Sequence, residues 1–212
     1  MTTERITRKL NEEVVIFETV NEGESGARAV APDHSPHAPH QPRKPLVQGA
    51  VPVEGAGLLH LVEQFLFHQA ELLDGKCWQD YIDLFAADGI YWMPVAAEQT
   101  EWLDSPSIFI EDKPLMTIRM GRVTHPNAWS QAPMWGTSHV VGNVVIESVS
   151  EERLTVRSRF QMLELRRDAQ RHFAGTYRHT LRRSADGLRI ELQRVDLLNS
   201  QAIFDYVLQI WV

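Results

Sequence analysis

The stretch Leu154–Arg167 (LTVRSRFQMLELRR) decides the fold, and the stretch Arg171–Arg183 (RHFAGTYRHTLRR) repeats its pattern. In both, apolar and polar residues alternate along the chain with a period of two. Such alternation is typical of antiparallel strands that have one covered face and one exposed face. The covered face is expected to carry Leu154, Val156, Phe160, Met162, Phe173, Tyr177 and Leu181, and the other face Thr155, Arg157, Arg159, Gln161, Arg178, Thr180 and Arg182.

Two neighbouring stretches extend this sheet. The ranges Thr137–Val149 and Leu188–Asn199 alternate in the same way. The sequence Ser184–Gly187 (SADG) between strands is typical of a hairpin turn. A last apolar alternation, Phe204–Val212, predicts a final strand. The second half of the chain is therefore expected to form a meander of long strands.

Helices are predicted before these strands. Gly75 is placed to end the first helix, and Asp112 to cap the third. Asp88-Gly89 is typical of a turn that leads into a strand. The expected elements are helices at Leu58–Asp74, Trp78–Phe85 and Leu115–Val123 and a strand at Ile90–Val95. Helices followed by a meander predict an α+β fold, a strongly curved antiparallel sheet wrapped around N-terminal helices.

The first 57 residues differ in composition from the rest. They are rich in Pro, Gly and His, as in SPHAPHQPRKP, and carry little apolar periodicity. Such a segment cannot bury enough apolar surface to offset the entropy lost on ordering. We expect residues 1–57 to form an extended or partly disordered tail and residues 58–212 to form one domain.

The bulk composition excludes several classes of protein. A net charge of −7 gives no reason to expect nucleic acid, and no stretch approaches the roughly 20 apolar residues of a membrane span. The first residues lack the apolar core of a secretory signal. The single Cys77 allows no internal disulfide, which is typical of a reducing compartment. We therefore expect a cytoplasmic protein without nucleic-acid or membrane partners.

Metal-binding chemistry is hard to build from these residues. A Rieske cluster needs two cysteines and two histidines, whereas the chain has only Cys77, which is predicted to be an ordinary thiol. Two further sets of possible ligands are not expected to converge on a metal. The first set lies on a solvated helix face and consists of His60/Glu63 and His68/Glu71. The second set lies in the extended tail and consists of Asp33, His34, His37 and His40. We predict no catalytic, cofactor-binding or metal-binding residue in this chain.

A pocket inside the curved sheet would need acid–base groups of its own. His179 shares a predicted strand face with Tyr177 and Leu181, so it is expected to be buried, either as a base or as a hydrogen-bonded core residue. An alternative interpretation is therefore a stand-alone lyase or isomerase, or a module that binds a small ligand. Its pocket candidates are His179, Tyr177, Asp83, His139 and Tyr81.

Charged and aromatic residues indicate a partner surface. Acids dominate between residues 58 and 112 and arginines between residues 153 and 194, which gives either two solvated faces or an arginine face that docks a partner. The loop His125–Gly136 is rich in helix and strand breakers and carries large aromatics, which is typical of an interfacial loop. The candidates for a subunit interface are Trp129, Trp135, Arg157, Arg159, Arg178 and Phe67.

From Leu58 to the C-terminus the chain resembles the small, or beta, subunit of Rieske-type aromatic-ring-hydroxylating dioxygenases. The resemblance rests on the order and spacing of six segments over nearly three quarters of the chain. They are VEQFLFHQAELLDGKCWQDYIDLFAADGIYWMPV (Val62–Val95), IEDKPLMTIRMGRV (Ile110–Val123), SHVVGNVVI (Ser138–Ile146), VRSRFQMLELRR (Val156–Arg167), HFAGTYRHTLRR (His172–Arg183) and VDLLN (Val195–Asn199). The chain departs from the family pattern in its long first 57 residues and in Ser138 and Gly142, which replace Arg and Ser.

The resemblance implies a cystatin-like, NTF2-like cone that serves as a structural subunit without a cofactor. It implies an α3β3 heterohexamer in which the large subunit carries the Rieske 2Fe-2S cluster and a mononuclear Fe(II). The assembly would cis-dihydroxylate an aromatic ring with O2 and NAD(P)H-derived electrons, delivered by a reductase and often a ferredoxin. The beta subunit would hold the large subunits together and contact neighbouring beta subunits, and the isolated chain would be inactive.

Overall fold

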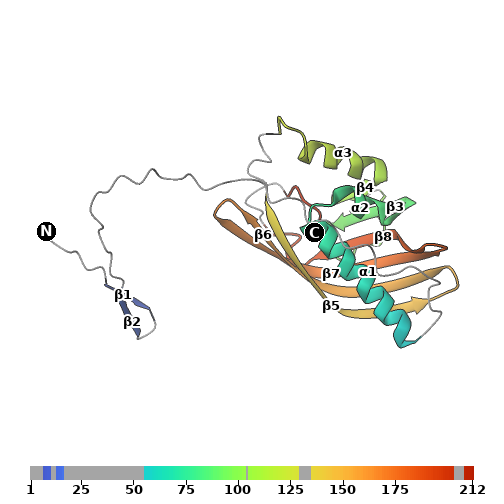
Figure 1. The fold of residues 1–212 in the computed structure, drawn as a ribbon, viewed down its shortest axis with the longest axis horizontal. Coiled ribbons are helices and arrows are strands. Elements are labelled where there is room, and N and C mark those ends of the chain that lie inside the picture. The colour runs from blue at the N-terminus through green and yellow to red at the C-terminus, as the bar shows by residue number, and fades with distance from the viewer. Residues whose placement is uncertain (1–6, 11–12, 17–54, 104, 129–134, 203–207) are drawn as a thin grey trace, which may run out of the picture. The chain divides into compact units, whose positions relative to one another are not determined.

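The computed structural model describes residues 7–10, 13–16, 55–103, 105–128, 135–202 and 208–212 (Figure 1). The chain divides into two compact units, Met1–Pro36 and His37–Val212. In the first unit, β1 (Thr7–Leu10) and β2 (Glu13–Ile16) pair as an antiparallel hairpin. The rest of the predicted tail stays a prediction, because most of it lies outside the described residues. No helix in the described ranges is long and apolar enough to cross a membrane.

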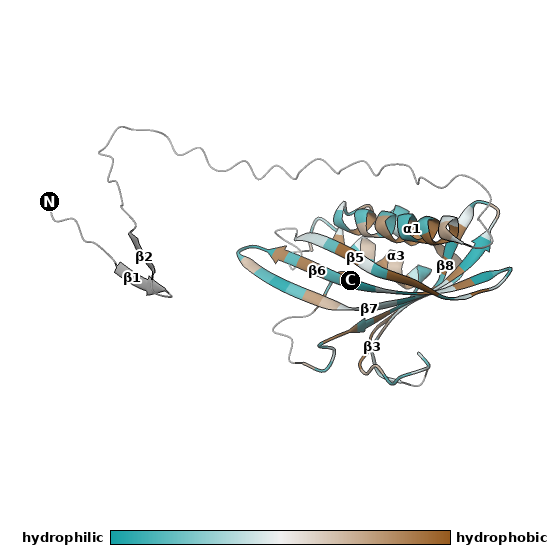
Figure 2. Ribbon diagram, turned by 90° about the horizontal axis from the view of Figure 1, so that it is seen from below, coloured by the Kyte–Doolittle hydropathy of each residue, from teal (hydrophilic) through white to brown (hydrophobic). Residues whose placement is uncertain are grey.

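The helix α1 (Ala56–Asp74) confirms the helix predicted over residues 58–74. Its apolar stripe includes Leu58, Val62 and Leu72, which are all buried. Figure 2 shows α1 lying across one face of the sheet, so the stripe is covered by the strands. Burial of such a stripe, more than helix propensity, stabilises a helix in a protein. The short helix α2 (Trp78–Asp83) follows at once, and it is shorter than predicted because Phe85 already begins the next strand.

The end of α1 differs in detail from the expectation. Gly75 follows the last helical residue, but its φ of −75° is ordinary for a helix, whereas Lys76 has a φ of 57°. The Cys77 N–H donates to the Leu72 carbonyl (2.8 Å). The Lys76 N–H donates to the Leu73 carbonyl (3.1 Å). This is a Schellman motif in which a lysine takes the left-handed position that glycine usually occupies.

The third helix, α3 (Lys113–Val123), begins as predicted. The Asp112 carboxylate accepts a hydrogen bond from the Leu115 N–H (2.9 Å), and Pro114 lies in the first turn. The cap satisfies an N–H that has no partner within the helix, and proline tolerates this position because its nitrogen carries no hydrogen. The local sequence alone therefore determines where this helix starts.

The second unit contains one six-stranded sheet. Its strands are β3 (Phe85–Pro94), β4 (Ser107–Asp112), β5 (Gly136–Val149), β6 (Arg153–Arg166), β7 (Ala169–Ser184) and β8 (Gly187–Leu197). Their order is β4-β3-β8-β7-β6-β5. The four long predicted strands are confirmed as β5 to β8, which pair antiparallel in sequence order. After α3 the chain continues with β5 at the far edge of the sheet and returns through β6 and β7 to β8. There β8 lies beside β3 and runs parallel to it.

One strand is missing from the predicted elements, and two local predictions are wrong. The edge strand β4 is absent from the predicted strands, because its apolar residues Ile108–Ile110 are consecutive and do not alternate. Asp88-Gly89 lies inside β3, at an irregularity of the register, and not in a turn before the strand. The end of the predicted last strand, Leu208–Val212, forms no strand. Its apolar side chains lie in the core: Leu208, Ile210, Trp211 and Val212. Residues 203–207 lie outside the described ranges.

The covered face of the sheet forms the core with α1 and α2. Phe160 of β6 stacks on Tyr177 of β7, with ring centroids 4.1 Å apart and planes 13° apart. Gly175 lies opposite Phe160 in the register. A Cβ atom at residue 175 would stand 3.0 Å from a carbon of the Phe160 ring and would overlap the Asp196 carbonyl of β8. The close approach of these strands therefore requires glycine at this position.

We expect Gly175→Ala to lower the free energy of unfolding by about 2–3 kcal/mol, because the added methyl group overlaps backbone in a packed sheet. Gly142→Ala is the matched control, since nothing lies within 4 Å of a Cβ atom at that position of β5. The control should change stability by less than about 1 kcal/mol. Chemical denaturation of both variants measures the difference, and equal stability would contradict the close-approach argument.

Candidate functional site

The covered face of the sheet carries a row of polar side chains inside the apolar core. Ser158 of β6 lies opposite Tyr177 of β7. Two residues further along β7, on the same face, His179 lies opposite Gln193 of β8. Tyr81 of α2 completes the row, because its hydroxyl donates to Gln193 Oε1 (3.0 Å). All five residues are at most 1% exposed. Sequence patterns miss Ser158 and Gln193, because these residue types normally lie at the surface.

His179 has no hydrogen-bond partner in the described part of the chain. Neither of its ring nitrogens is bonded, nor is the Tyr177 hydroxyl. The imidazole packs edge-on against the Tyr177 ring, with centroids 5.7 Å apart. Burial lowers the pKa of His179 to about 3, and burial raises the pKa of the Tyr177 hydroxyl well above its usual value. Both groups are therefore neutral at pH 7, and His179 is a weak base.

His139 pairs with an acid that sequence analysis does not identify. The Asp74 carboxylate accepts hydrogen bonds from the His139 backbone N–H (2.8 Å) and the Thr137 hydroxyl (2.9 Å). Its Oδ1 also lies 2.5 Å from His139 Nδ1. Burial on its own raises the pKa of Asp74, but the hydrogen bonds and the charge of His139 outweigh burial, so the pKa is lowered. The pair joins the end of α1 to the start of β5.

Residues 208–212 enter the core beside the polar row. The Trp211 ring lies 5.2 Å from the Tyr81 ring, and its Nε1 donates to the buried Glu111 (2.9 Å). Arg119 pairs with the same Glu111 carboxylate, so this buried charge is neutralised. The hollow beside Trp211 has a volume of about 10 Å³, which is about the room that one water needs. Among the described residues, Trp211 and Tyr81 thus pack together with little space beside them.

Asp83 lies at the surface, in contrast to the inward position expected of a pocket residue. Its carboxylate is 60% exposed and lies 3.9 Å from Lys113 Nζ. Gln79, one turn earlier on α2, donates to the same carboxylate (3.0 Å). The reason is the helical period, because Tyr81 and Ile82 take the buried side of this short helix and turn Asp83 outward.

The structure describes Cys77 and the candidate metal ligands of α1. Burial, followed by the charge of Asp80, raises the pKa of the Cys77 thiol, which makes its thiolate scarcer at neutral pH. Across the described residues, no three His, Cys, Asp or Glu side chains come together in a way that could hold a metal ion. Asp33 and the tail histidines lie outside the described ranges.

The strand arginines lie on the other face of the sheet, among carboxylates. Arg157 donates to Glu147 of β5 (2.7 Å). Arg178 lies 3.7 Å from the same Glu147 and 3.3 Å from Asp196 of β8, so ion pairs run across four strands. Arg159 is exposed and donates to a threonine hydroxyl (2.7 Å). Exposed pairs of this kind contribute about 0–1 kcal/mol each. The face is thus of mixed charge, because Glu147 of β5 and Asp196 of β8 lie among the arginines of β6 and β7.

The aromatic interface candidates divide between surface and core. Phe67 is 39% exposed on α1, which places part of an aromatic ring at the surface. Trp135 is only 2% exposed and lines the same small hollow as Trp78 and Trp211. Trp129 lies outside the described residues. That these residues contact a partner stays a prediction.

The buried, neutral His179 makes stability depend on pH. The unfolded chain protonates this histidine near pH 6.5, whereas the folded chain holds its pKa at about 3. Between these values the unfolded state binds more protons, so acid favours unfolding. We expect this residue to lower the free energy of unfolding by about 2 kcal/mol from pH 7 to pH 5. Denaturation of the wild type and His179→Gln at both pH values isolates the effect, and an equal loss in both proteins would contradict it.

Comparison with known proteins identifies relatives of this chain. A family model described as "Ring hydroxylating beta subunit" matches residues 68–202, from the middle of α1 to beyond β8. The beta subunit of benzene 1,2-dioxygenase from Pseudomonas putida is 30% identical over 155 residues. This alignment covers 68% of the chain and 83% of the relative.

Solved structures share the fold. The beta subunit of benzoate 1,2-dioxygenase from Burkholderia mallei matches with a TM-score of 0.57 and 28% identity, over 69% of this chain and 95% of that one. A scytalone dehydratase-like protein from Novosphingobium aromaticivorans matches with a TM-score of 0.51 and 16% identity, over 71% and 89%, which is a likeness of fold alone. These matches confirm the α+β, NTF2-like fold. The chain belongs to the family of ring-hydroxylating beta subunits, the small subunits of aromatic-ring-hydroxylating dioxygenases.

Proposed function

We propose that this chain holds the large subunits of an aromatic-ring-hydroxylating dioxygenase together and performs no chemistry itself. The observation that carries the proposal is the family match over residues 68–202, which spans nearly all of the helix and sheet unit. The relatives are named beta subunits, which makes each one component of a larger enzyme. The proposed assembly is a cytoplasmic α3β3 heterohexamer that receives electrons from a reductase and, often, a ferredoxin.

The side chains present support a division of labour between subunits. A Rieske cluster takes two cysteine and two histidine ligands, and this chain has one cysteine. We therefore place the Rieske 2Fe-2S cluster and the mononuclear Fe(II), which supply electron transfer and oxygen activation, in the large subunit. This chain contributes a rigid body with a packed interior. Such a body can hold large subunits at the fixed distances that the chemistry needs.

An aromatic compound is the proposed substrate of the assembly. One relative is named for benzene and another for benzoate, so the names include both a hydrocarbon and an aromatic acid. Because Trp211 and its neighbours fill the cone beside the polar row, the substrate is proposed to bind in the large subunit.

A stand-alone lyase or isomerase is disfavoured by the same interior. Such an enzyme needs a base whose pKa lies near the working pH and that reaches the substrate. The pKa of His179 is about 3, and Asp83 faces solvent. The polar row is therefore interpreted as part of the core.

Assembly with a large subunit tests the proposal. When co-expressed with the large subunit of the same enzyme, the chain should form a complex whose mass by light scattering fits three copies of each. Supplied with reductase, ferredoxin and NADH, the isolated chain should form no product from benzene or benzoate. The complex of the chain with the large subunit should form product if either compound is its substrate. Product from the isolated chain, or two subunits that stay separate, would contradict the proposal.

The exposed interface candidates give a second test. We expect Phe67→Asp or Arg159→Glu to raise the dissociation constant of the complex at least about 10-fold, because interface aromatics and arginines dominate binding energy. The isolated variants should keep their stability to within about 1 kcal/mol, since both side chains are exposed. Ile118→Asp on α3, 60% exposed, is the control. If only the control weakens assembly, the interface lies elsewhere.

A further inference from the structure

One end of the open face of the sheet, opposite the covered face, carries no acid, lysine or arginine. The register of β5, β6 and β7 aligns residues in rows across these strands. Three rows lie on the open face, because their residues alternate with the buried Phe160, Met162 and Phe173. These rows, here called the three-row block, are Gly136–Leu165–Gln170, Ser138–Leu163–His172 and Val140–Gln161–Ala174.

The next rows along the same strands are charged. Arg159 lies in the row beside the block, is exposed and donates to the Thr176 hydroxyl (2.7 Å). Arg157 and Arg178 lie opposite each other in the row after that and pair with carboxylates. The open face therefore has one end whose charges are paired within the sheet and one end without these charges.

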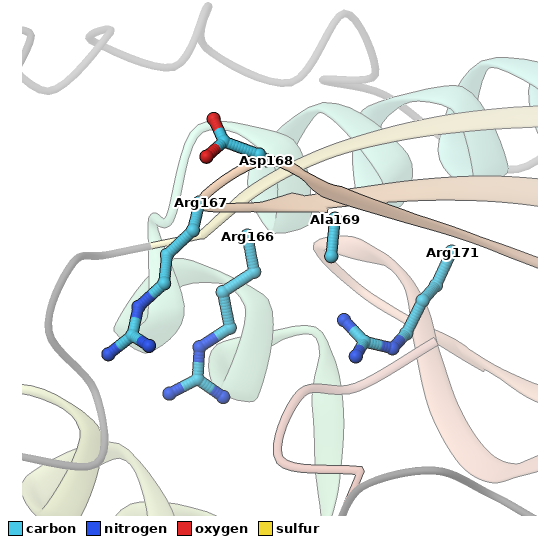
Figure 3. Close-up of a pocket in the computed structure, with 5 residues that line it drawn as sticks. All are labelled: Arg166, Arg167, Asp168, Ala169 and Arg171. Atoms are coloured by element: carbon cyan, nitrogen blue, oxygen red, sulfur yellow. The ribbon is translucent and has the colours of Figure 1, made fainter.

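The arginines at the tip of the β6–β7 hairpin do not belong to the three-row block. Figure 3 shows Arg166 and Arg171 on one side of the hairpin and Asp168, in the turn, on the other side. Arg166 alternates in step with the buried Met162, and Arg171 in step with the buried Phe173. Both arginines therefore lie on the covered side of the sheet, where they have partners within the chain. The side chains of the block are not interrupted by their charges.

The three-row block is exposed and hollowed. Val140 is 66% exposed, and Leu165 is 44% exposed. Leu198, which is 85% exposed, continues one row at the end of β8, because its N–H donates to the Ala174 carbonyl (2.9 Å). A contiguous apolar patch with a polar rim is typical of a protein–protein contact. The hollow has a volume of about 220 Å³ and is lined from the open face by Ser138, Val140, Gln161, Leu163, His172 and Ala174.

We propose that the three-row block docks on the large subunit and that the hollow takes one apolar side chain of that subunit. The inference rests on the proposed function. The size of the hollow supports a single side chain, because cavities for small ligands usually measure about 300–1,000 Å³. Arg159 would lie in the polar rim of this contact, since interfaces combine an apolar centre with a polar rim.

A second copy of this chain fits the block less well than the large subunit does. The net charge of −7 repels an identical chain, and the block has no acid or base that could offset this repulsion. A two-fold contact centred on the block would also set hollow against hollow, because both copies present the same surface. A different protein can instead supply a projecting side chain.

A charge placed in the block tests the docking surface. We expect Val140→Asp to raise the dissociation constant of the purified chain for the large subunit at least about 10-fold, because the contact then buries an unpaired charge. Val145→Asp is the matched control, since Val145 is 41% exposed on the same face of β5 but lies opposite Arg157, in the charged rows. The control should bind like the wild type.

A larger side chain in the hollow tests the same surface without a new charge. Ala174→Phe occupies space in the hollow, so the dissociation constant should again rise at least about 10-fold. This loss should be the same at roughly 0.05 M and 0.3 M NaCl, because salt screens charges and not apolar contacts. Thermal unfolding of each isolated variant checks that the fold is intact.

The outcomes separate this inference from the proposed function. If the wild type binds the large subunit and the two folded block variants bind equally well, the docking surface is wrong and the proposed function stands. An equal loss in Val145→Asp would overturn the assignment to the block. If the wild type fails to bind, both proposals are wrong. Light scattering of the isolated chain tests a second copy, and a dimer that Val140→Asp dissociates would overturn docking of the large subunit at this face.

Discussion

The unbroken pairing of β6 with β7 is the constraint on which the rest of the structure depends. Its register places Phe160 and Tyr177 in the core and Arg157 and Arg178 on the open face. A shift of one residue would exchange the two faces, because side chains alternate with a period of two. The same pairing ends in the tight turn that presents Arg167. The core and the ion-pair face are thus two consequences of one register.

The interior shows why the fold does not decide the function. Ser158, Tyr177 and His179 are buried on the covered face, where a ligand of a hollow cone would also lie. Here Trp211 packs beside Tyr81, and the small hollow next to it has room for about one water. Unbonded polar atoms in such a place cost about 1–3 kcal/mol each, which the surrounding apolar burial must offset. The same architecture can enclose a reaction or be packed as a solid support, and residue chemistry distinguishes the two.

Local sequence patterns predict the helices and strands that are determined by residues close together in the chain. The long strands and α1 follow from periodicity, and the start of α3 follows from the Asp112 cap. Contacts between distant segments escape such reasoning. The parallel β3–β8 pair, the bond of Asp74 to His139 and the packing of Leu208–Val212 each join residues far apart in the chain. The interleaved ion pairs escape it too, because Glu147 and Asp196 lie outside the arginine-rich segment and meet its arginines only through strand pairing.

Charge acts on two length scales in this subunit. A net charge of −7 is felt at long range, where it keeps copies of the chain apart, but salt screens it beyond about 8–10 Å in the cell. A guanidinium fork acts only on contact, where water is excluded and the bond to a carboxylate is strongest. On the open face, Arg157 and Arg178 meet carboxylates of neighbouring strands, so these charges act within the sheet and contribute about 0–1 kcal/mol for each pair.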